Sequence, residues 1–272
     1  MANKIGWCSK TWNPVWGCLN HCEYCYARGI ARFRYKQMYE IEFNHWKKFH
    51  PILKDPFHCD WDMDYLSGLK DFKPTFLNAQ FDKKLPKKPQ RIFVGSMSEI
   101  YYWEKEWIEK VIEKIRQYRQ HTFQFLTKFP EVYSRYKFPD NCWLGVTITN
   151  QEDIHYNWSY FFNIPNRRNV KFFFSFEPLL GEINLSFYLS VDTLHKGFYQ
   201  LIDWVIIGAE TGNRKGKVIP KLEWIVDIVE YCRNNKIPVY LKDSIIKAYP
   251  DLAFEYPNFH KFPGFYDKKE NR

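Results

Sequence analysis

The chain has 272 residues, of which 45% are hydrophobic and 26% charged, with 12 glycines and 15 prolines. This composition excludes a disordered, collagenous or low-complexity protein, and we expect one globular domain over residues 1–272. The net charge of +9 and the 20% aromatic content allow a nucleic-acid partner, because phosphates attract cations and bases stack on rings, although an A+T-rich genome would produce the same bias.

The N-terminal part begins with a predicted strand at Thr11–Trp16, followed by a loop with three cysteines and a predicted helix at Ala27–Tyr39. Pro14 has no backbone N–H to donate, so this strand should lie at the edge of a sheet. Residues 40–90 carry five prolines among aromatic residues and fit no strand–helix unit. We expect them to form an irregular insertion after the first helix.

From Arg91 onward, short β-branched or aromatic runs alternate with longer amphipathic ones, which is typical of strand–helix units around a parallel sheet. Helical spacing of apolar residues predicts helices over Trp103–Tyr118 and from Ile225 to Asn234. Because such crossovers are right-handed, the units should curl into a partial, open α/β barrel of the (β/α)6 type. The predicted strands are Arg91–Gly95, Thr122–Leu126, Trp143–Thr147, Val170–Phe176, Trp204–Ile207 and Val239–Leu241.

Cysteine content and apolar runs bear on the cellular compartment. The seven cysteines are an odd number, and Met1–Lys10 has no apolar signal-peptide core, so we do not expect a disulfide framework. The longest apolar runs, such as Val170–Phe176, are shorter than the ~20 residues that a membrane span needs. We therefore expect a cytoplasmic protein with no membrane partner.

Three cysteines, Cys18, Cys22 and Cys25, lie within eight residues at the spacing C-x3-C-x2-C. This spacing brings three thiolates within reach of one metal centre, which either zinc or an iron–sulfur cluster could use. A structural zinc site needs four ligands, whereas three thiolates on a four-iron cluster leave one iron free to bind a small molecule. Neither Cys8 nor His21 is a strong candidate for the fourth ligand, so the spacing favours the cluster.

A series of further motifs runs in order through nearly the whole chain. The matching stretches are Thr11–Val15, Gly17-Cys18, Cys25–Arg28, Phe93–Glu99, Leu126–Pro130, Trp143–Thr147, Ser175–Gly181 and Asp203–Glu210. Together they resemble a phage-associated family of proteins similar to radical S-adenosylmethionine (SAM) enzymes, a family often paired with three-Cys-motif partner proteins. The cysteine loop itself is similar to that of spore photoproduct lyase, which acts on thymine dimers in DNA.

This resemblance implies a partial barrel of the radical SAM superfamily with a 4Fe-4S cluster held by Cys18, Cys22 and Cys25. It also implies reductive cleavage of SAM to a 5′-deoxyadenosyl radical that abstracts hydrogen from a substrate. An external electron donor of the flavodoxin or ferredoxin type would supply the electron. The substrate class it suggests is a nucleic acid or modified nucleotide, such as a thymine-derived base, in a bacterial or phage-infected cell.

Polar side chains follow the predicted strands, where βα barrels carry their working residues. Glu177 follows a very apolar strand and needs a partner, and Glu210 follows a glycine that lets a ligand approach closely. Together with Lys242 after the last strand, these two glutamates are the expected catalytic residues. The residues expected to bind the cofactor, partly by resemblance, are Tyr24, Ser96, Ser98, Lys128, Thr147, Thr149, Asn150, Glu177 and Glu210. The alternative for each is a polar group that only bonds the backbone of its loop.

Basic residues form three groups, which favours binding to a phosphate backbone. One comprises Arg28, Arg32 and Lys36 on one helix face after the cysteines, and another comprises Arg214, Lys215 and Lys217. A third group lies between Lys83 and Arg91. Two other functions stay open: a zinc-stabilised nucleic-acid-binding module without catalysis, and a radical SAM enzyme that acts on a peptide or small metabolite.

Overall fold

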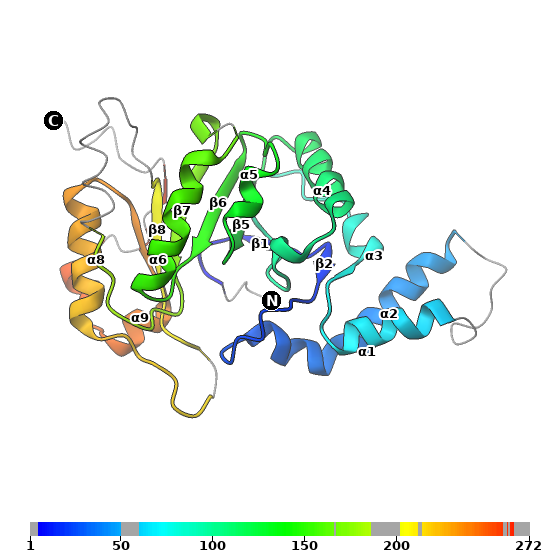
Figure 1. The fold of residues 1–272 in the computed structure, drawn as a ribbon, viewed down its shortest axis with the longest axis horizontal. Coiled ribbons are helices and arrows are strands. Elements are labelled where there is room, and N and C mark those ends of the chain that lie inside the picture. Colours follow the sequence, from blue (N-terminus) through cyan, green and yellow to red (C-terminus); the bar gives the residue numbers. More distant parts are fainter. Residues whose placement is uncertain are drawn as a thin grey trace. The chain divides into compact units, whose positions relative to one another are not determined.

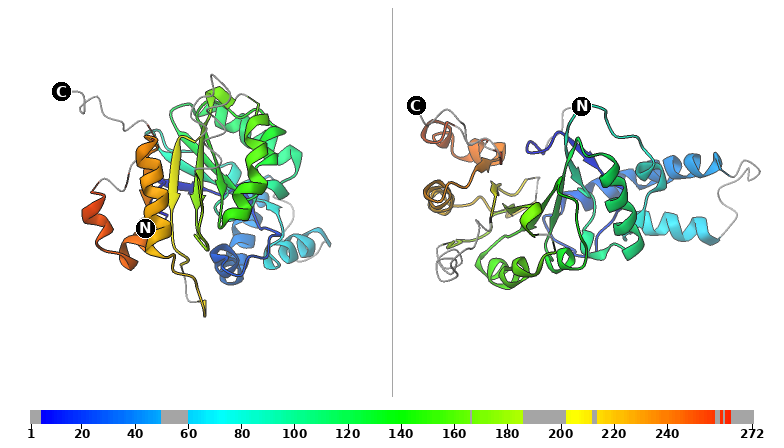
Figure 2. Two further views of the ribbon diagram at one scale, coloured as in Figure 1. Left: turned by 60° about the vertical axis from the view of Figure 1, so that its left-hand side comes forward. Right: turned by 90° about the horizontal axis from the view of Figure 1, so that it is seen from above.

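The computed structural model describes residues 5–49, 60–165, 167–185, 202–211, 214–257, 260 and 262–263 (Figures 1 and 2). Contacts divide the chain into two compact units. We call residues 8–126 the N-terminal unit and residues 1–7 with 127–272 the C-terminal unit. Each unit combines parallel strands with helices, which confirms the predicted α/β class. The prediction of a single domain stays a prediction.

The N-terminal unit contains the parallel strands β1 (Lys10–Trp12), β4 (Arg91–Val94) and β5 (Thr122–Thr127), in that order. The single strand predicted at Thr11–Trp16 is wrong, because the chain breaks at Pro14. Its second half, β2 (Val15–Trp16), pairs antiparallel with β3 (Thr75–Phe76). The predicted edge position is confirmed, since β1 lies at the end of the strand order.

Helices form much of the described part of residues 40–90, where an irregular insertion was predicted. The helices of this unit are α1 (Tyr26–Lys47), α2 (Asp60–Lys70), α3 (Asn78–Phe81), α4 (Lys105–Gln117) and a short 3-10 helix at Ile100–Tyr102. The helix expected at Ala27–Tyr39 therefore continues to Lys47, and α2 packs along it (Figure 2). The physical reason is a shared apolar core, in which Ala31 and Tyr39 meet Leu69 and Phe72. Tertiary burial stabilises helices that their own sequence signals only weakly.

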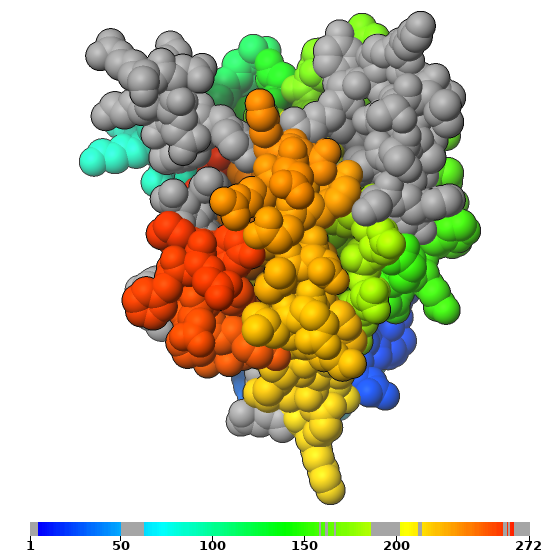
Figure 3. Space-filling model, turned by 90° about the vertical axis from the view of Figure 1, so that its left-hand side faces the viewer, coloured from blue at the N-terminus to red at the C-terminus, as the bar shows by residue number. Residues whose placement is uncertain are grey.

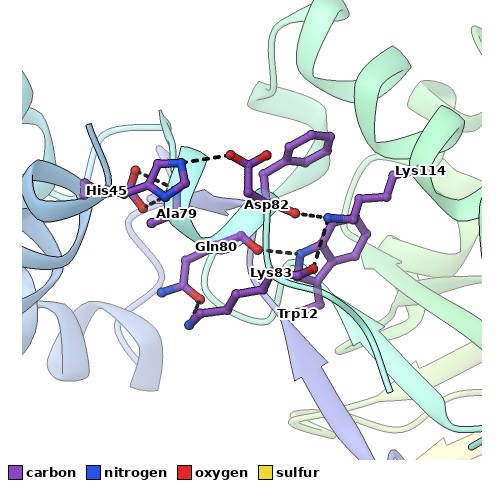
Figure 4. A network of polar contacts seen from close by, with 9 residues as sticks. Trp12, His45, Ala79, Gln80, Asp82, Lys83 and Lys114 are labelled. Atoms are coloured by element: carbon purple, nitrogen blue, oxygen red, sulfur yellow. Dashed lines mark hydrogen bonds and ion pairs between the residues drawn. The ribbon is translucent and has the colours of Figure 1, made fainter. Parts of the chain in front are cut away.

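A polar network ties α3 and the segment after it to the rest of the N-terminal unit (Figure 4). Both carboxylate oxygens of Glu42 accept the N–H of Ala79 at 3.1 Å, and His45 Nε2 lies 2.8 Å from Asp82 Oδ2. Trp12 Nε1 donates to Gln80 O at 3.0 Å. Lys114 Nζ donates to the carbonyl oxygens of Phe81 and Lys83. These contacts connect α3 and the residues after it to α1, β1 and α4.

The C-terminal unit contains four parallel strands in the order β6 (Cys142–Thr147), β7 (Lys171–Phe176), β8 (Trp204–Ile207) and β9 (Val239–Leu241). The predicted strands are confirmed to within one residue. The helices are α5 (Glu131–Ser134), α6 (Gln151–Asn157), α8 (Leu222–Asn234), α9 (Asp243–Ala248) and α10 (Leu252–Glu255), with 3-10 turns at Trp158–Asn163 and Arg167–Asn169. Figure 3 shows the face of the molecule on which α8 (orange) lies beside α9 and α10 (red-orange).

Strand register decides which side chains of the C-terminal unit share a face. Thr147, Ser175, Ile206 and Tyr240 are register partners across the four strands, so their side chains point to the same side. Aromatic rings fill this side toward the amino ends, where Trp204 lies 6.2 Å from Tyr240 between ring centroids. The carboxyl ends carry polar groups instead. Loops after these strands are where parallel sheets bind ligands.

Candidate functional site

The three-cysteine loop lies in the N-terminal unit between β2 and α1. Cys18, Cys22 and Cys25 are free thiols and half-buried. Cys18 Sγ accepts the N–H of Asn20, and Cys25 Sγ accepts the N–H of Arg28, each at 3.4 Å. The second contact makes Cys25 the N-cap of α1. Backbone N–H groups therefore already point at two of the three sulfurs.

The donors around this loop fit an iron–sulfur cluster. Arg28 Nη2 donates to Cys18 O at 3.0 Å, while Arg28 Nε is buried without a partner. A buried guanidinium N–H of this kind, on a side chain bonded to the cysteine loop, suits an anionic thiolate-bound cluster, whose sulfurs accept hydrogen bonds. Across the described residues, no three His, Cys, Asp or Glu side chains are already gathered around a common point.

Burial raises the pKa of the Cys18 thiol to about 12, and the nearby Glu99 carboxylate and the other two cysteines act in the same direction. The Asn20 N–H opposes this shift. In the absence of metal the Cys18 thiol is therefore protonated at neutral pH. Metal binding must release that proton, so the affinity for metal should rise with pH.

The turn after β4 and the residue Phe72 support the cysteine loop through their backbones. Gly17 N donates to Met97 O, and Cys18 N donates to Phe72 O, both at 2.9 Å. Gly17 also forms a parallel bridge with Ser98. These bonds fix the position and direction of the chain where it enters the cysteine loop.

The two serines after β4 lie beside this loop. Ser96 Oγ donates to Asn13 Oδ1 at 3.1 Å, and Ser96 O accepts the Tyr26 hydroxyl at 2.7 Å. Ser98 Oγ accepts Trp103 Nε1 at 3.1 Å. The sequence did not single out Asn13, although its place directly after β1 is a usable signal.

Two more residues of this neighbourhood were missed. The Tyr102 hydroxyl donates to Asn20 Oδ1 at 2.7 Å and so attaches the cysteine loop to the 3-10 helix Ile100–Tyr102. No local pattern in the sequence predicts that contact, because 82 residues separate the partners. Tyr24, a predicted cofactor ligand, is half-buried within the loop.

In the C-terminal unit, the polar residues after β6 act on the start of α6. The N–H and hydroxyl of Thr149 both donate to Asp153 Oδ2, at 2.7 and 2.5 Å. Asn150 Oδ1 accepts Asp153 N at 2.9 Å, a helix-capping bond. Thr149 and Asn150 thus have a structural role here. Their binding of a cofactor, like that of buried Thr147 and half-buried Lys128, stays a prediction.

Glu177 and Lys242, both expected at the site, meet as an ion pair after β7 and β9. Gly208 makes the pair fit, because a Cβ there would lie 2.9 Å from Lys242 Cδ and 3.2 Å from Glu177 Cγ. The hydroxyl of Ser175, two residues before Glu177, is buried without a partner. Ser175 lies at the carboxyl end of β7, the end at which parallel sheets carry their ligand-binding residues.

Glu210 has a different partner. Its side chain is only 2% exposed and receives two bonds from Arg214, Nε to Oε1 at 2.6 Å and Nη2 to Oε2 at 2.7 Å. Val218 N also donates to Oε2, at 3.3 Å. The Arg214 hydrogen bonds lower the pKa of Glu210, against the effect of burial. The carboxylate therefore anchors the segment after β8, which projects from the unit (Figures 1 and 3).

Arg214→Gln should destabilise the protein by about 1–3 kcal/mol at neutral pH, because it leaves the buried Glu210 carboxylate without its cation. The loss is limited because Arg214 is partly exposed, so solvent already screens the pair. The lowered folded pKa of Glu210 means that its stabilisation exists above the usual value near 4.5 and is lost as the pH falls below it. Urea unfolding of both proteins at neutral and acidic pH measures this. Arg233→Gln, which breaks an exposed pair with Glu230, is the matched control and should cost below about 0.5 kcal/mol. Equal stability losses at both pH values would contradict the assignment.

The predicted site residues thus fall into two groups. The cysteines, Ser96 and Ser98 gather in the N-terminal unit, whereas Glu177 pairs with Lys242 in the C-terminal unit and Glu210 pairs with Arg214. The catalytic assignments of Glu177, Glu210 and Lys242 stay predictions. No helix among the described residues is long and apolar enough to cross a membrane.

Parallel strands, polar side chains at their carboxyl ends and a three-thiol loop define an α/β protein with candidate ligand-binding residues in the position usual for such folds. More particularly, the chain belongs to the family described as "Protein of unknown function (DUF5131)", which matches residues 2–245. No curated protein and no solved structure is significantly similar to it.

Proposed function

We propose that the protein is a radical SAM enzyme with a partial (β/α)6-type barrel, and that it acts on a nucleic acid or modified nucleotide. A thymine-derived base in phage or bacterial DNA is the substrate that the sequence resemblance favours. When bound, a 4Fe-4S cluster would supply an open iron for SAM and the electron that cleaves it to a 5′-deoxyadenosyl radical. An external flavodoxin or ferredoxin would deliver that electron.

One observation carries the proposal: three free thiols share a loop that is bonded through its backbone to the turn after β4 and to Phe72. Cys18, Cys22 and Cys25 would hold the cluster, and the Arg28 N–H groups would face its negative charge. Zinc would need a fourth ligand, whereas the cluster needs only these three.

The other residues would bind and orient. Ser96 and Ser98 lie on the strand end that supports the loop, so they are suited to contact SAM. In the C-terminal unit, Glu177 and Lys242 offer one negative and one positive group at the ends of β7 and β9. Such a set can hold a polar substrate in one orientation, which is the protein's share in cofactor chemistry.

The nucleic-acid substrate is supported by charge. The net charge is +9, and Lys215 and Lys217 lie on the segment after β8 that Glu210 anchors through its ion pair with Arg214. Cations on a projecting segment beside the carboxyl ends of the strands suit contacts to phosphates.

Anaerobic reconstitution with iron and sulfide tests the proposed function. We expect a brown protein with close to four irons per chain, which after reduction cleaves SAM to 5′-deoxyadenosine. Nucleoside mass spectrometry after incubation with SAM, reductant and candidate modified DNA would then identify the altered base. A colourless protein that retains one zinc would refute the enzyme and favour a zinc-stabilised binding module. SAM cleavage together with negligible DNA binding at low ionic strength would favour a peptide or small-metabolite substrate.

A further inference from the structure

The solvent face of α1 carries an unusual set of exposed apolar side chains. Phe33 is 89% exposed, Tyr26 50% and Ile30 39%. Their spacing of four and three residues puts them on one side of the helix. Single exposed apolar residues are common and need no explanation, but three in a row along one face form a continuous surface.

Positive charge flanks this apolar row. Arg32, Arg34 and Lys36 are exposed, and within the described residues none of them has an ion-pair or hydrogen-bond partner. No acidic residue lies between Tyr26 and Tyr39, and Glu40, one turn after Lys36, forms no ion pair with it in the described structure. On α4, by contrast, Lys105, Lys110 and Arg116 each pair with a glutamate of the same helix.

The structure corrects one part of the sequence-based grouping. Arg28 was expected to share this exposed face with Arg32 and Lys36. It is instead half-buried, donates to Cys18 O and lies over the Phe72 ring at 5.3 Å from its centroid. Helix geometry gives the reason, because Arg28 falls on the side of Ala27 and Ala31, which pack in the core.

We propose that this face of α1 binds single-stranded nucleic acid, with a base stacked on Phe33 and phosphates held by Arg32, Arg34 and Lys36. The aromatic surface and the cations select such a ligand together. An unpaired base presents a flat face that a ring can stack on, whereas a duplex hides its base faces and offers mainly phosphates and groove edges. An acidic protein would also match the charges, but it carries planar side chains only at scattered positions, whereas every nucleotide of a single strand carries a base.

The position of the face agrees with a substrate surface. Tyr26 is the first residue of α1 and directly follows Cys25. At about 1.5 Å per residue, Phe33 lies about 10 Å along the helix from Tyr26. A strand bound along this face would therefore pass beside the cysteine loop. Its role as a substrate surface rests on the proposed function, but the binding itself requires no cluster.

Fluorescence anisotropy of the full-length protein with a labelled oligothymidylate tests the proposal. We expect tighter binding to the single strand than to a duplex of equal length. Phe33→Ala should weaken binding by about 5- to 150-fold, which corresponds to the loss of one stacked base. Phe254→Ala is the matched control, because Phe254 is 84% exposed on α10 and lies next to Glu255. It should bind like the unaltered protein.

A triple variant tests the cations. Arg32→Gln with Arg34→Gln and Lys36→Gln should reduce the slope of log affinity against log salt concentration by about 2, because each phosphate contact on a single strand contributes about 0.7. The control removes the same charge from α4, with Lys105→Gln, Lys110→Gln and Arg116→Gln, and should leave the slope unchanged. All six side chains lie at the surface of their helices, so circular dichroism should show an intact fold.

Three results would overturn the proposal: equal affinity for single strand and duplex, no effect of Phe33→Ala, or competition by polyglutamate as effective as that by unlabelled oligothymidylate. Its failure is distinguishable from failure of the proposed function. A protein that binds no cluster but loses oligothymidylate affinity on Phe33→Ala supports the surface and refutes the enzyme. A protein that cleaves SAM but binds no oligothymidylate supports the enzyme and refutes the nucleic-acid-binding surface.

Discussion

Gly17→Ala should prevent the three-cysteine loop from forming. Gly17 has a φ of +104°, and a Cβ there would lie 2.0 Å from Lys73 O and 2.8 Å from Pro74 N. Both clashing atoms belong to the backbone, so no side-chain rotation relieves them. We expect a loss of unfolding free energy of about 3–5 kcal/mol, since the bonds from Gly17 and Cys18 to Met97 and Phe72 would break with the shift.

Gly29→Ala is the matched control for this change. Gly29 lies in α1, is exposed, and a Cβ there would meet nothing within 4 Å. In an exposed helix position the alanine should stabilise the protein by about 0.5–1 kcal/mol. Urea unfolding and iron content after reconstitution measure both variants. If Gly17→Ala matched the unaltered protein in stability and iron, the strained entry into the loop would not be what positions the cysteines.

Replacing any one of the loop cysteines should abolish cluster chemistry. Cys18→Ala, Cys22→Ala and Cys25→Ala each remove one of three thiolates, so we expect iron near background and no 5′-deoxyadenosine. The three side chains are only half-buried, so the fold should persist and thermal unfolding should change little. Absorbance of the reconstituted protein and chromatography of SAM products are the measurements.

Cys232→Ala separates cluster loss from general damage. Cys232 is fully buried on the apolar side of α8, where burial raises the pKa of its thiol and keeps it neutral. Its loss should cost about 1–2 kcal/mol of stability but leave iron and SAM cleavage intact. The zinc-stabilised module predicts otherwise: Cys22→Ala would strongly destabilise the fold, and there would be no turnover to lose.

Features that depend on neighbouring residues could be predicted from the sequence. The strands β8 and β9 agree residue for residue with their predicted bounds, because short buried runs between turns have few alternatives. The polar residues expected after the parallel strands follow β4, β5, β6, β7, β8 and β9, whereas their roles in a site stay predictions. The cysteine spacing is local in the same sense, since all three cysteines lie within eight consecutive residues.

Features that depend on residues far apart in the chain could not be predicted from the sequence. The length of α1 depends on Leu69 and Phe72, which pack against it from far along the chain. The break of the first predicted strand depends on the pairing of Val15 with Phe76. In both cases the burial that decides the structure comes from a segment whose placement the local pattern does not reveal.

By itself, the sequence determined the α/β class, the order of the strands along the chain and the presence of a three-thiol loop, because periodicity and spacing are local properties. Only the tertiary structure decided which charges are neutralised. It pairs Glu177 with Lys242 across 65 residues, packs the half-buried Arg28 against Cys18 and Phe72, and leaves Arg32, Arg34 and Lys36 exposed around Phe33. Ion pairing and exposure depend on which surfaces folding brings together, and charges with the same local pattern can therefore end with opposite roles.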